Sequence, residues 1–153
     1  MAENQYRVPD ISLVGPDHVR RYQETAGQVG YIWNGATILL LTSIGRKSGL
    51  PRTNALIFGQ DGDDYLVVAS IGGAPQHPLW YRNLLDRPEA EIQVRDRHIQ
   101  VTATTTADDD KARLWQIMTK VWPNYDVYQS RTHRVIPVVV LTPANEACRD
   151  ETH

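Results

Sequence analysis

The sequence of 153 residues has little cysteine and no long apolar run. Its single cysteine, Cys148, cannot form an intrachain disulfide, and no Cys/His pattern predicts a zinc site. A reducing compartment is therefore the default, and we expect a cytoplasmic protein. The longest apolar stretch, Ala36 to Leu41, is interrupted by Thr37 and falls far short of the roughly twenty residues that span a bilayer. Any membrane contact would have to be peripheral.

The sequence also lacks an excess of charge of either sign. Its 16 Lys and Arg residues stand against 18 Asp and Glu, for a net charge of -2. Proteins that bind nucleic acid non-specifically normally carry a basic excess, so we expect no nucleic-acid partner. The five histidines show no metal-ligand spacing, and we expect no metal site. The absence of G-x-G-x-x-G and P-loop patterns disfavours the common nucleotide-binding routes.

What the chain does contain is a succession of short strand patterns joined by turn signals. Six segments are rich in strand formers, at 36–44, 53–60, 65–70, 91–94, 98–104 and 135–141. Helices are predicted over 16–29 and 79–87, over a stretch after residue 107, and for a short turn beyond Pro123. Regular crossover helices between the strands are missing, which disfavours a doubly wound sheet. An α+β class fits best, as a split antiparallel β-barrel of about six strands with helices packed at its ends.

Local signals set expectations for element ends and for the domain plan. Asp17 is a plausible N-cap of the first helix, which we expect to lie on the domain rather than in its core. The stretch Thr106 to Asp109 resembles a capping box, and Pro137 suggests an edge or a bulge in the last strand. We expect a lead and helix over 1–35, the barrel over 36–143 and a polar tail over 144–153.

One predicted loop concentrates positive charge. No acidic residue occurs between residues 25 and 60, yet Arg46, Lys47 and Arg52 fall within this loop between two strands. Each arginine can grip a phosphate or carboxylate with two hydrogen bonds, and the lysine adds a point charge. Because screening lengths are about 8 Å at physiological salt, this local cluster decides what binds there. Composition alone leaves a merely solvated hairpin as an equal alternative.

A second stretch brings small and aromatic residues together. Ser70 ends a predicted strand, and the two glycines after it allow close approach of a ligand, although a plain turn would look the same. Trp80 and Tyr81 follow, and they can supply a flat apolar wall and a hydroxyl. Core packing is the more common use of a tryptophan such as Trp80.

A third stretch places aromatic residues at regular spacing. Trp122, Tyr125 and Tyr128 recur every third residue around Pro123, so they share one face. A stripe of this kind is usually core. Because tyrosine is often only partly buried, the three groups can also close an aromatic pocket.

Together these stretches resemble the deazaflavin-dependent nitroreductase family of actinobacteria. The resemblance runs from about Ala36 to Pro143 through GRKSGLPRTNAL at 45–56, VASIGGAPQHPLWYRN at 68–83 and WPNYDVYQSRTHRVIPVVVLTP at 122–143. It implies the split β-barrel fold shared with flavin-binding oxidases. It also implies the cofactor coenzyme F420, an 8-hydroxy-5-deazaflavin with a phospholactyl oligoglutamate tail.

The resemblance assigns residues to this cofactor. Four positions match the family's tail-binding residues, namely Arg46, Lys47, Ser48 and Arg52. The segments that would enclose the deazaflavin ring contribute Thr53, Asn54, Ala55, Leu56, Ile57, Val68, Ala69, Ser70, Ile71, Leu79, Trp80, Tyr81, Arg82 and Asn83. Tyr125 matches a tyrosine that lines the reaction pocket, with Tyr128 near it.

The implied activity is hydride transfer from reduced F420 to an electron-poor small molecule, such as a quinone, an enone or a nitro compound. The candidate catalytic residues are Ser70, Tyr125 and Tyr128, with Ser70 and Tyr125 as donors to the acceptor's oxygen. One preorganised donor contributes about 3 kcal/mol. Two alternatives stay open, a non-catalytic deazaflavin carrier and an FMN-dependent oxidoreductase of the same barrel class. We expect a monomer or a homodimer.

Overall fold

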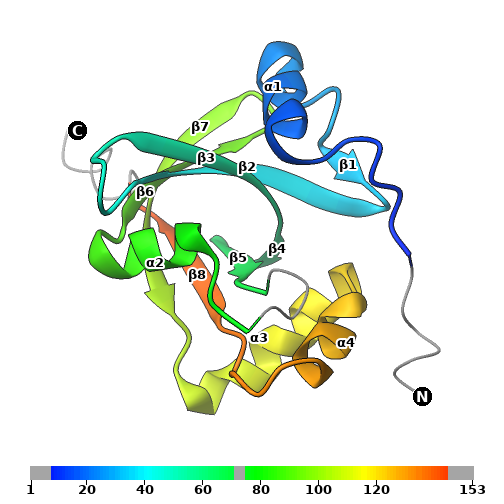
Figure 1. Ribbon diagram of the computed structural model, residues 1–153, viewed down its shortest axis with the longest axis vertical. Coiled ribbons are helices and arrows are strands. Elements are labelled where there is room, and N and C mark those ends of the chain that lie inside the picture. Colours follow the sequence, from blue (N-terminus) through cyan, green and yellow to red (C-terminus); the bar gives the residue numbers. More distant parts are fainter. Residues whose placement is uncertain (1–7, 71–74, 145–153) are drawn as a thin grey trace.

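The computed structural model describes residues 8–70 and 75–144 (Figure 1). Its elements follow the order α1 (Gly15–Thr25), β1 (Ile32–Trp33), β2 (Ala36–Ile44), β3 (Pro51–Ile57), β4 (Gly59–Asp61), β5 (Asp64–Val68), α2 (Leu79–Asp86), β6 (Glu89–Val94), β7 (Arg97–Thr105), α3 (Asp108–Val121), α4 (Asn124–Ser130) and β8 (Val138–Pro143). None of the described helices is long and apolar enough to cross a membrane.

The strands form an antiparallel sheet that curls into a half-barrel (Figure 1). Within the described residues it has eight strands in the order β1-β2-β6-β7-β8-β5-β4, with β3 paired to β2 off this path. The predicted split antiparallel barrel is confirmed. The prediction of about six strands falls short because β1 is only two residues long, and because the single strand predicted at 53–60 is divided between β3 and the three-residue β4.

Strand β2 is buried on both faces, as its continuous apolar run predicts. Leu39 and Leu41 pack into the main core cluster with residues of β5, β6, β7 and β8. Ile38 and Leu40 pack on the opposite face against Tyr22 of α1. The first helix lies on the sheet, as expected, with most of its residues exposed and only His18 and Tyr22 buried.

Tyr22 fixes α1 to the sheet. Its hydroxyl donates to the carbonyl oxygen of Ile38 at 2.9 Å and lies 3.3 Å from that of Gln93. The same hydroxyl accepts from the backbone N–H of Arg95 at 2.8 Å. The N-cap of α1 is Val14 without a side-chain cap, so the predicted cap at Asp17 is wrong.

Helices α3 and α4 lie together at one end of the half-barrel, near β4, β5 and β8 (Figure 1). Leu114 and Met118 of α3 are buried there against Leu66 of β5. A side chain added at Gly59 of β4 would meet the sulfur of Met118 at 2.8 Å, closer than carbon atoms pack. A larger residue at this position would therefore require the buried Met118 side chain to shift.

Two further local predictions are wrong. The N-cap of α3 is Ala107 without a side-chain cap, because the backbone N–H of Thr106 still pairs with the carbonyl of Val138 in line with the sheet. Pro137 precedes β8, a strand that lies between β5 and β7 rather than at an edge. The carbonyl of Pro137 accepts from the N–H of Ala69 at 3.0 Å, a pairing that needs no N–H from proline.

Candidate functional site

Two cavities of about 630 and 910 Å³ adjoin along β3. The smaller cavity lies among α1, β3 and α4, and the larger lies between the loop at 45–50, the start of β3 and α2. Thr53, Asn54 and Trp80 line both cavities, which are together termed the groove. The larger cavity is termed the basic end and the smaller one the aromatic end.

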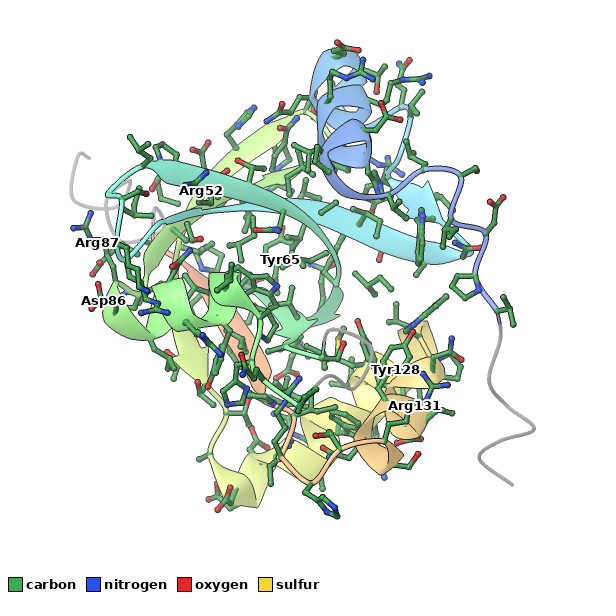
Figure 2. All side chains as sticks on the ribbon, viewed as in Figure 1. Arg52, Tyr65, Asp86, Arg87, Tyr128 and Arg131 are labelled. Carbon is green, nitrogen blue, oxygen red and sulfur yellow. The ribbon has the colours of Figure 1, made fainter. Side chains whose placement is uncertain are left out.

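Three cations line the basic end, at Arg46, Lys47 and Arg52. All three side chains are exposed, and none of them forms an ion pair with an acidic side chain among the described residues. Figure 2 shows Arg52 on β3, on the opposite side of the view from Tyr128 on α4. Cations that lack an internal partner and border a cavity are available to an anionic ligand.

Asn83 of α2 holds the loop that carries these cations. Its side-chain oxygen accepts from the backbone N–H of Arg46 at 3.1 Å, and its amide nitrogen donates to the hydroxyl of Ser43 at 3.3 Å. Within the loop, the N–H of Gly45 donates to the carbonyl of Leu50 at 2.8 Å. The hydrogen bonds of the Arg46 and Gly45 N–H groups fix both the start of the loop and its position relative to α2.

The aromatic end is lined by Trp122, Tyr125 and Tyr128, which the sequence predicted to share a face. The rings of Tyr125 and Tyr128 meet edge to face with centroids 6.0 Å apart. The indole N–H of Trp122 donates to the hydroxyl of Tyr128 at 3.3 Å, and the ring of Trp33 packs 5.5 Å from that of Trp122. These contacts hold the wall rigid before any ligand arrives.

Tyr125 has the most strongly altered ionisation of the site. Burial, and to a smaller extent the phenol of Tyr128, raises the pKa of Tyr125 far above its ordinary value. Its side chain is only 4% exposed, although it lines the cavity. Among the described residues, none forms a hydrogen bond with the Tyr125 hydroxyl. This group therefore keeps its proton and can donate it in a hydrogen bond to a ligand.

Ser70 lines the same cavity, just beyond the end of β5. The guanidinium of Arg134 donates to the carbonyl oxygen of Ser70 at 2.7 Å and to that of Ala69 at 3.1 Å. These two hydrogen bonds hold the backbone at Ser70. The residue is only 7% exposed, so it is largely shielded from bulk water.

The structure gathers most of the predicted site residues along the groove. The basic end is lined by Arg46, Lys47, Ser48, Arg52, Thr53, Asn54, Leu79, Trp80 and Asn83. The aromatic end is lined by Thr53, Asn54, Ala55, Leu56, Ile57, Val68, Ser70, Trp80, Tyr125 and Tyr128.

Three predicted cofactor residues lie outside the groove, and a fourth is not described. Ala69, Tyr81 and Arg82 line neither cavity. Ala69 and Tyr81 are buried in the main core cluster, whereas Arg82 donates to the side chain of Gln76 at 3.0 Å. Ile71 lies outside the described residues.

Helix α1 and Trp33 form a wall of the aromatic end that the sequence analysis missed. The helix contributes Pro16, Val19 and Gln23 among others. The only signal in the sequence was a weakly apolar helical face. A local pattern of this kind shows that a helix packs somewhere, but it does not show which cavity the helix covers.

Comparison with known proteins places most of this chain in one family of sequences. Residues 16–143 match the family model described as F420H(2)-dependent quinone reductase. An F420H(2)-dependent quinone reductase of Mycobacterium tuberculosis is 48% identical over 129 residues, which cover 82% of this chain and 87% of that protein.

Two solved structures extend the similarity to three dimensions. The structure of an F420-H2 dependent reductase matches with a TM-score of 0.64 and 34% identity, over 68% of this chain and 92% of that one. A structure described as a domain-swapped dimer matches with a TM-score of 0.67 and 31% identity, over 82% of this chain and 94% of that one.

Proposed function

This chain belongs to the F420H(2)-dependent quinone reductase family, and from that premise we propose that it reduces a quinone with hydride from reduced coenzyme F420 held along the groove. The family membership agrees with the deazaflavin cofactor and the oxidoreductase activity expected from the sequence. The observation that carries the proposal is a groove with a buried, protonated tyrosine at one end and, at the other, cations that form no ion pair within the described part of the chain.

The residues of the groove fit an elongated cofactor with an anionic tail and a flat ring. The phosphate and carboxylates of a tail require cations that are not already neutralised, and the basic end offers three of them. A ring requires an apolar slot, which β3 and Trp80 border. Because Trp80 lines both cavities, one ligand can occupy the two together.

In this proposal the tail is bound by side chains of the basic end. Arg46 and Arg52 present planar guanidinium groups that can bind a phosphate or carboxylate through two parallel hydrogen bonds, and Lys47 adds a point charge. The hydroxyl oxygen of Ser48 accepts from the N–H of Leu50 at 3.1 Å, which leaves its proton available for a phosphate oxygen.

The walls of the aromatic end orient the ring and exclude water. Trp80 is 6% exposed and meets the Tyr81 ring edge-on at 6.3 Å, so its plane is fixed by core packing. Ala55, Leu56 and Ile57 of β3 line the same cavity. When bound, the reduced cofactor supplies the hydride, and the protein's contribution is to hold donor and acceptor in a reactive orientation.

Ser70 and Tyr125 are the proposed donors to the quinone oxygen as it gains negative charge. The raised pKa of Tyr125 means that this hydroxyl stabilises the oxygen by a hydrogen bond without surrendering its proton. We therefore assign the final proton of the hydroquinone to water rather than to Tyr125. Tyr128 acts beside Tyr125 as the partner that shapes the wall.

The acceptor class is tested by mixing the protein with reduced F420 and short-chain quinones, enones and nitro compounds. We expect the absorbance of oxidised F420 to return with quinones, and more slowly with the other two classes. Tight cofactor binding with no oxidation by any acceptor would instead favour the carrier alternative. Binding of FMN more tightly than F420 in parallel titrations would favour the flavin alternative.

The remaining expectations about partners and location stay predictions. The chain is proposed to act as a monomer or a homodimer in the cytoplasm. Size-exclusion chromatography with light scattering distinguishes the two assembly states.

A further inference from the structure

We propose that Arg134 is a positioning residue that fixes Ser70 relative to α4, the helix that carries Tyr125. This inference rests on the proposed reductase activity, because it concerns the two groups that would hold the quinone oxygen. Arg134 itself lines neither cavity. Its effect would therefore be exerted through the backbone around it.

One guanidinium group reaches two consecutive carbonyls at the end of β5. It donates to Ala69 through Nη1 at 3.1 Å and to Ser70 through Nη2 at 2.7 Å. Successive carbonyls of an extended strand point to opposite sides. Both of these meet the same planar group just after the last residue of β5, where the alternating strand pattern ends, and the serine lines the cavity there.

The main chain at Arg134 is tied to α4. The side-chain amide of Gln129, a residue of α4, donates to the carbonyl of Arg134 at 2.8 Å. The oxygen of the same amide accepts from the backbone N–H of Ile136 at 2.9 Å. A continuous series of hydrogen bonds therefore leads from α4 through Gln129 and Arg134 to Ser70.

His77 provides an independent reporter of this arrangement. Its Nδ1 lies 3.0 Å from Nη1 of Arg134, so the uncharged ring accepts from the guanidinium. Its other close neighbours are the Tyr81 ring, at 5.0 Å and edge-on, and the charge of Arg82. Burial, then the positive charges of Arg134 and Arg82, lower the pKa of His77 below its ordinary value.

The planar fork, and not only the charge, is what the arrangement needs. A lysine ammonium is a point charge and cannot reproduce two diverging hydrogen bonds held in one plane. Arg134→Lys therefore separates geometry from electrostatics, and Gln129→Met breaks the same connection from the α4 side without changing any charge. Arg113→Lys is the matched control. The Arg113 guanidinium also bridges two acceptors, but these are the carboxylates of Asp61 and Asp110, and they lie away from the groove.

We expect Arg134→Lys and Gln129→Met each to lower kcat for quinone reduction about tenfold, because small displacements of reacting groups are costly. The dissociation constant for F420, measured by fluorescence titration, should change less than about twofold. Arg113→Lys should match the wild type in both. Full activity in Arg134→Lys, or an equal loss in cofactor affinity and kcat, would overturn the proposal.

A second measurement needs no turnover. In NMR titrations without cofactor, the pKa of His77 should rise toward its ordinary value in Arg134→Met and stay at the wild-type value in Arg113→Lys. An unchanged pKa in Arg134→Met would show that the guanidinium does not occupy this place, and would overturn the inference. If the wild type itself fails to oxidise reduced F420 with any quinone, the proposed function fails, whereas the His77 titration still reports on the placement of Arg134.

Discussion

The two ends of the groove differ in how far their side chains already interact with other groups of the protein. At the basic end, Arg46, Lys47 and Arg52 are exposed and have no acidic partner among the described residues. At the aromatic end, Tyr125 and Ser70 are buried, and neighbouring rings or hydrogen bonds fix their positions. The first arrangement suits binding of a charged group from solution, and the second suits stabilisation of charge that appears only during a reaction.

This difference predicts that substitutions at the two ends change different kinetic quantities. Long, solvated side chains contribute to affinity, but they pay side-chain entropy when they are ordered. A buried donor that is already aligned contributes little to ground-state affinity, because the neutral carbonyl of a quinone is a weak acceptor. Changes at the basic end should therefore appear in the cofactor dissociation constant, and changes at the aromatic end in kcat.

The largest effect is expected from Tyr125→Phe. Loss of one preorganised donor to a developing oxyanion lowers kcat by about 100-fold, while the dissociation constant for F420 stays within about twofold of the wild type. Stopped-flow measurement of F420 oxidation by a quinone checks this, with Tyr65→Phe in the barrel core as the control. An unchanged rate would remove Tyr125 from the mechanism.

Arg52→Ala should have an effect about ten times smaller, and this effect should appear in the dissociation constant for F420 rather than in kcat. Removal of one unpaired guanidinium is expected to raise the dissociation constant for F420 about tenfold, with kcat at saturating cofactor unchanged. Fluorescence titration measures the affinity, and Arg97→Ala, at an exposed strand end away from the groove, is the control. Equal affinity of wild type and Arg52→Ala would mean that the loop is merely solvated.

Salt should separate the two ends without a substitution. Exposed charges are screened over a Debye length of about 8 Å at physiological ionic strength, whereas a buried neutral hydroxyl is not. An increase of sodium chloride from about 50 to about 200 mM should weaken F420 binding several-fold and leave kcat at saturating cofactor unchanged. Titrations at the two salt concentrations test this, and a salt effect confined to kcat would contradict the division of roles.

The smallest effect concerns the stability of the segment behind Ser70. The pKa of His77 in the folded protein is lowered from its ordinary value of 6.5, so its contribution to stability is present above that pH and is lost as the pH falls through the folded value. Urea unfolding on the acidic side of neutrality should show a shallower loss of stability in His77→Gln than in the wild type. If the free energy of unfolding depended on pH identically in the two proteins, His77 would not contribute to the acid sensitivity of this segment.

The sequence predicted the barrel and most of the groove because both leave local signals. The run through β2 is apolar on both faces, and Asp61, Gly62 and Asp63 mark the β4–β5 hairpin. The cations at 46, 47 and 52 are close in sequence, so their clustering could be predicted without knowledge of the fold. The capping box at Thr106 was wrong because pairing with β8 extends past the end of β7 and overrides the local preference.

The features that the sequence did not predict depend on contacts between distant residues. Nothing in the stretch around Tyr22 indicates that its hydroxyl meets backbone groups of β2 and of the turn after β6. The same holds for Arg134, which lies 64 residues from Ser70 in the chain. Interactions of this kind need the fold, because periodicity and turn chemistry describe only near neighbours in sequence.

The close approach at Gly59 has a consequence for the reacting groups. A methyl group placed there would lie 2.8 Å from the sulfur of Met118, so this fully buried side chain would have to shift. Met118 packs in the same core cluster as Trp122 and Tyr125, so its displacement would reach the wall of the aromatic end. Gly59 of β4 lines neither cavity, yet we expect Gly59→Ala to lower kcat, because the displaced Met118 side chain would change the position of the Tyr125 hydroxyl.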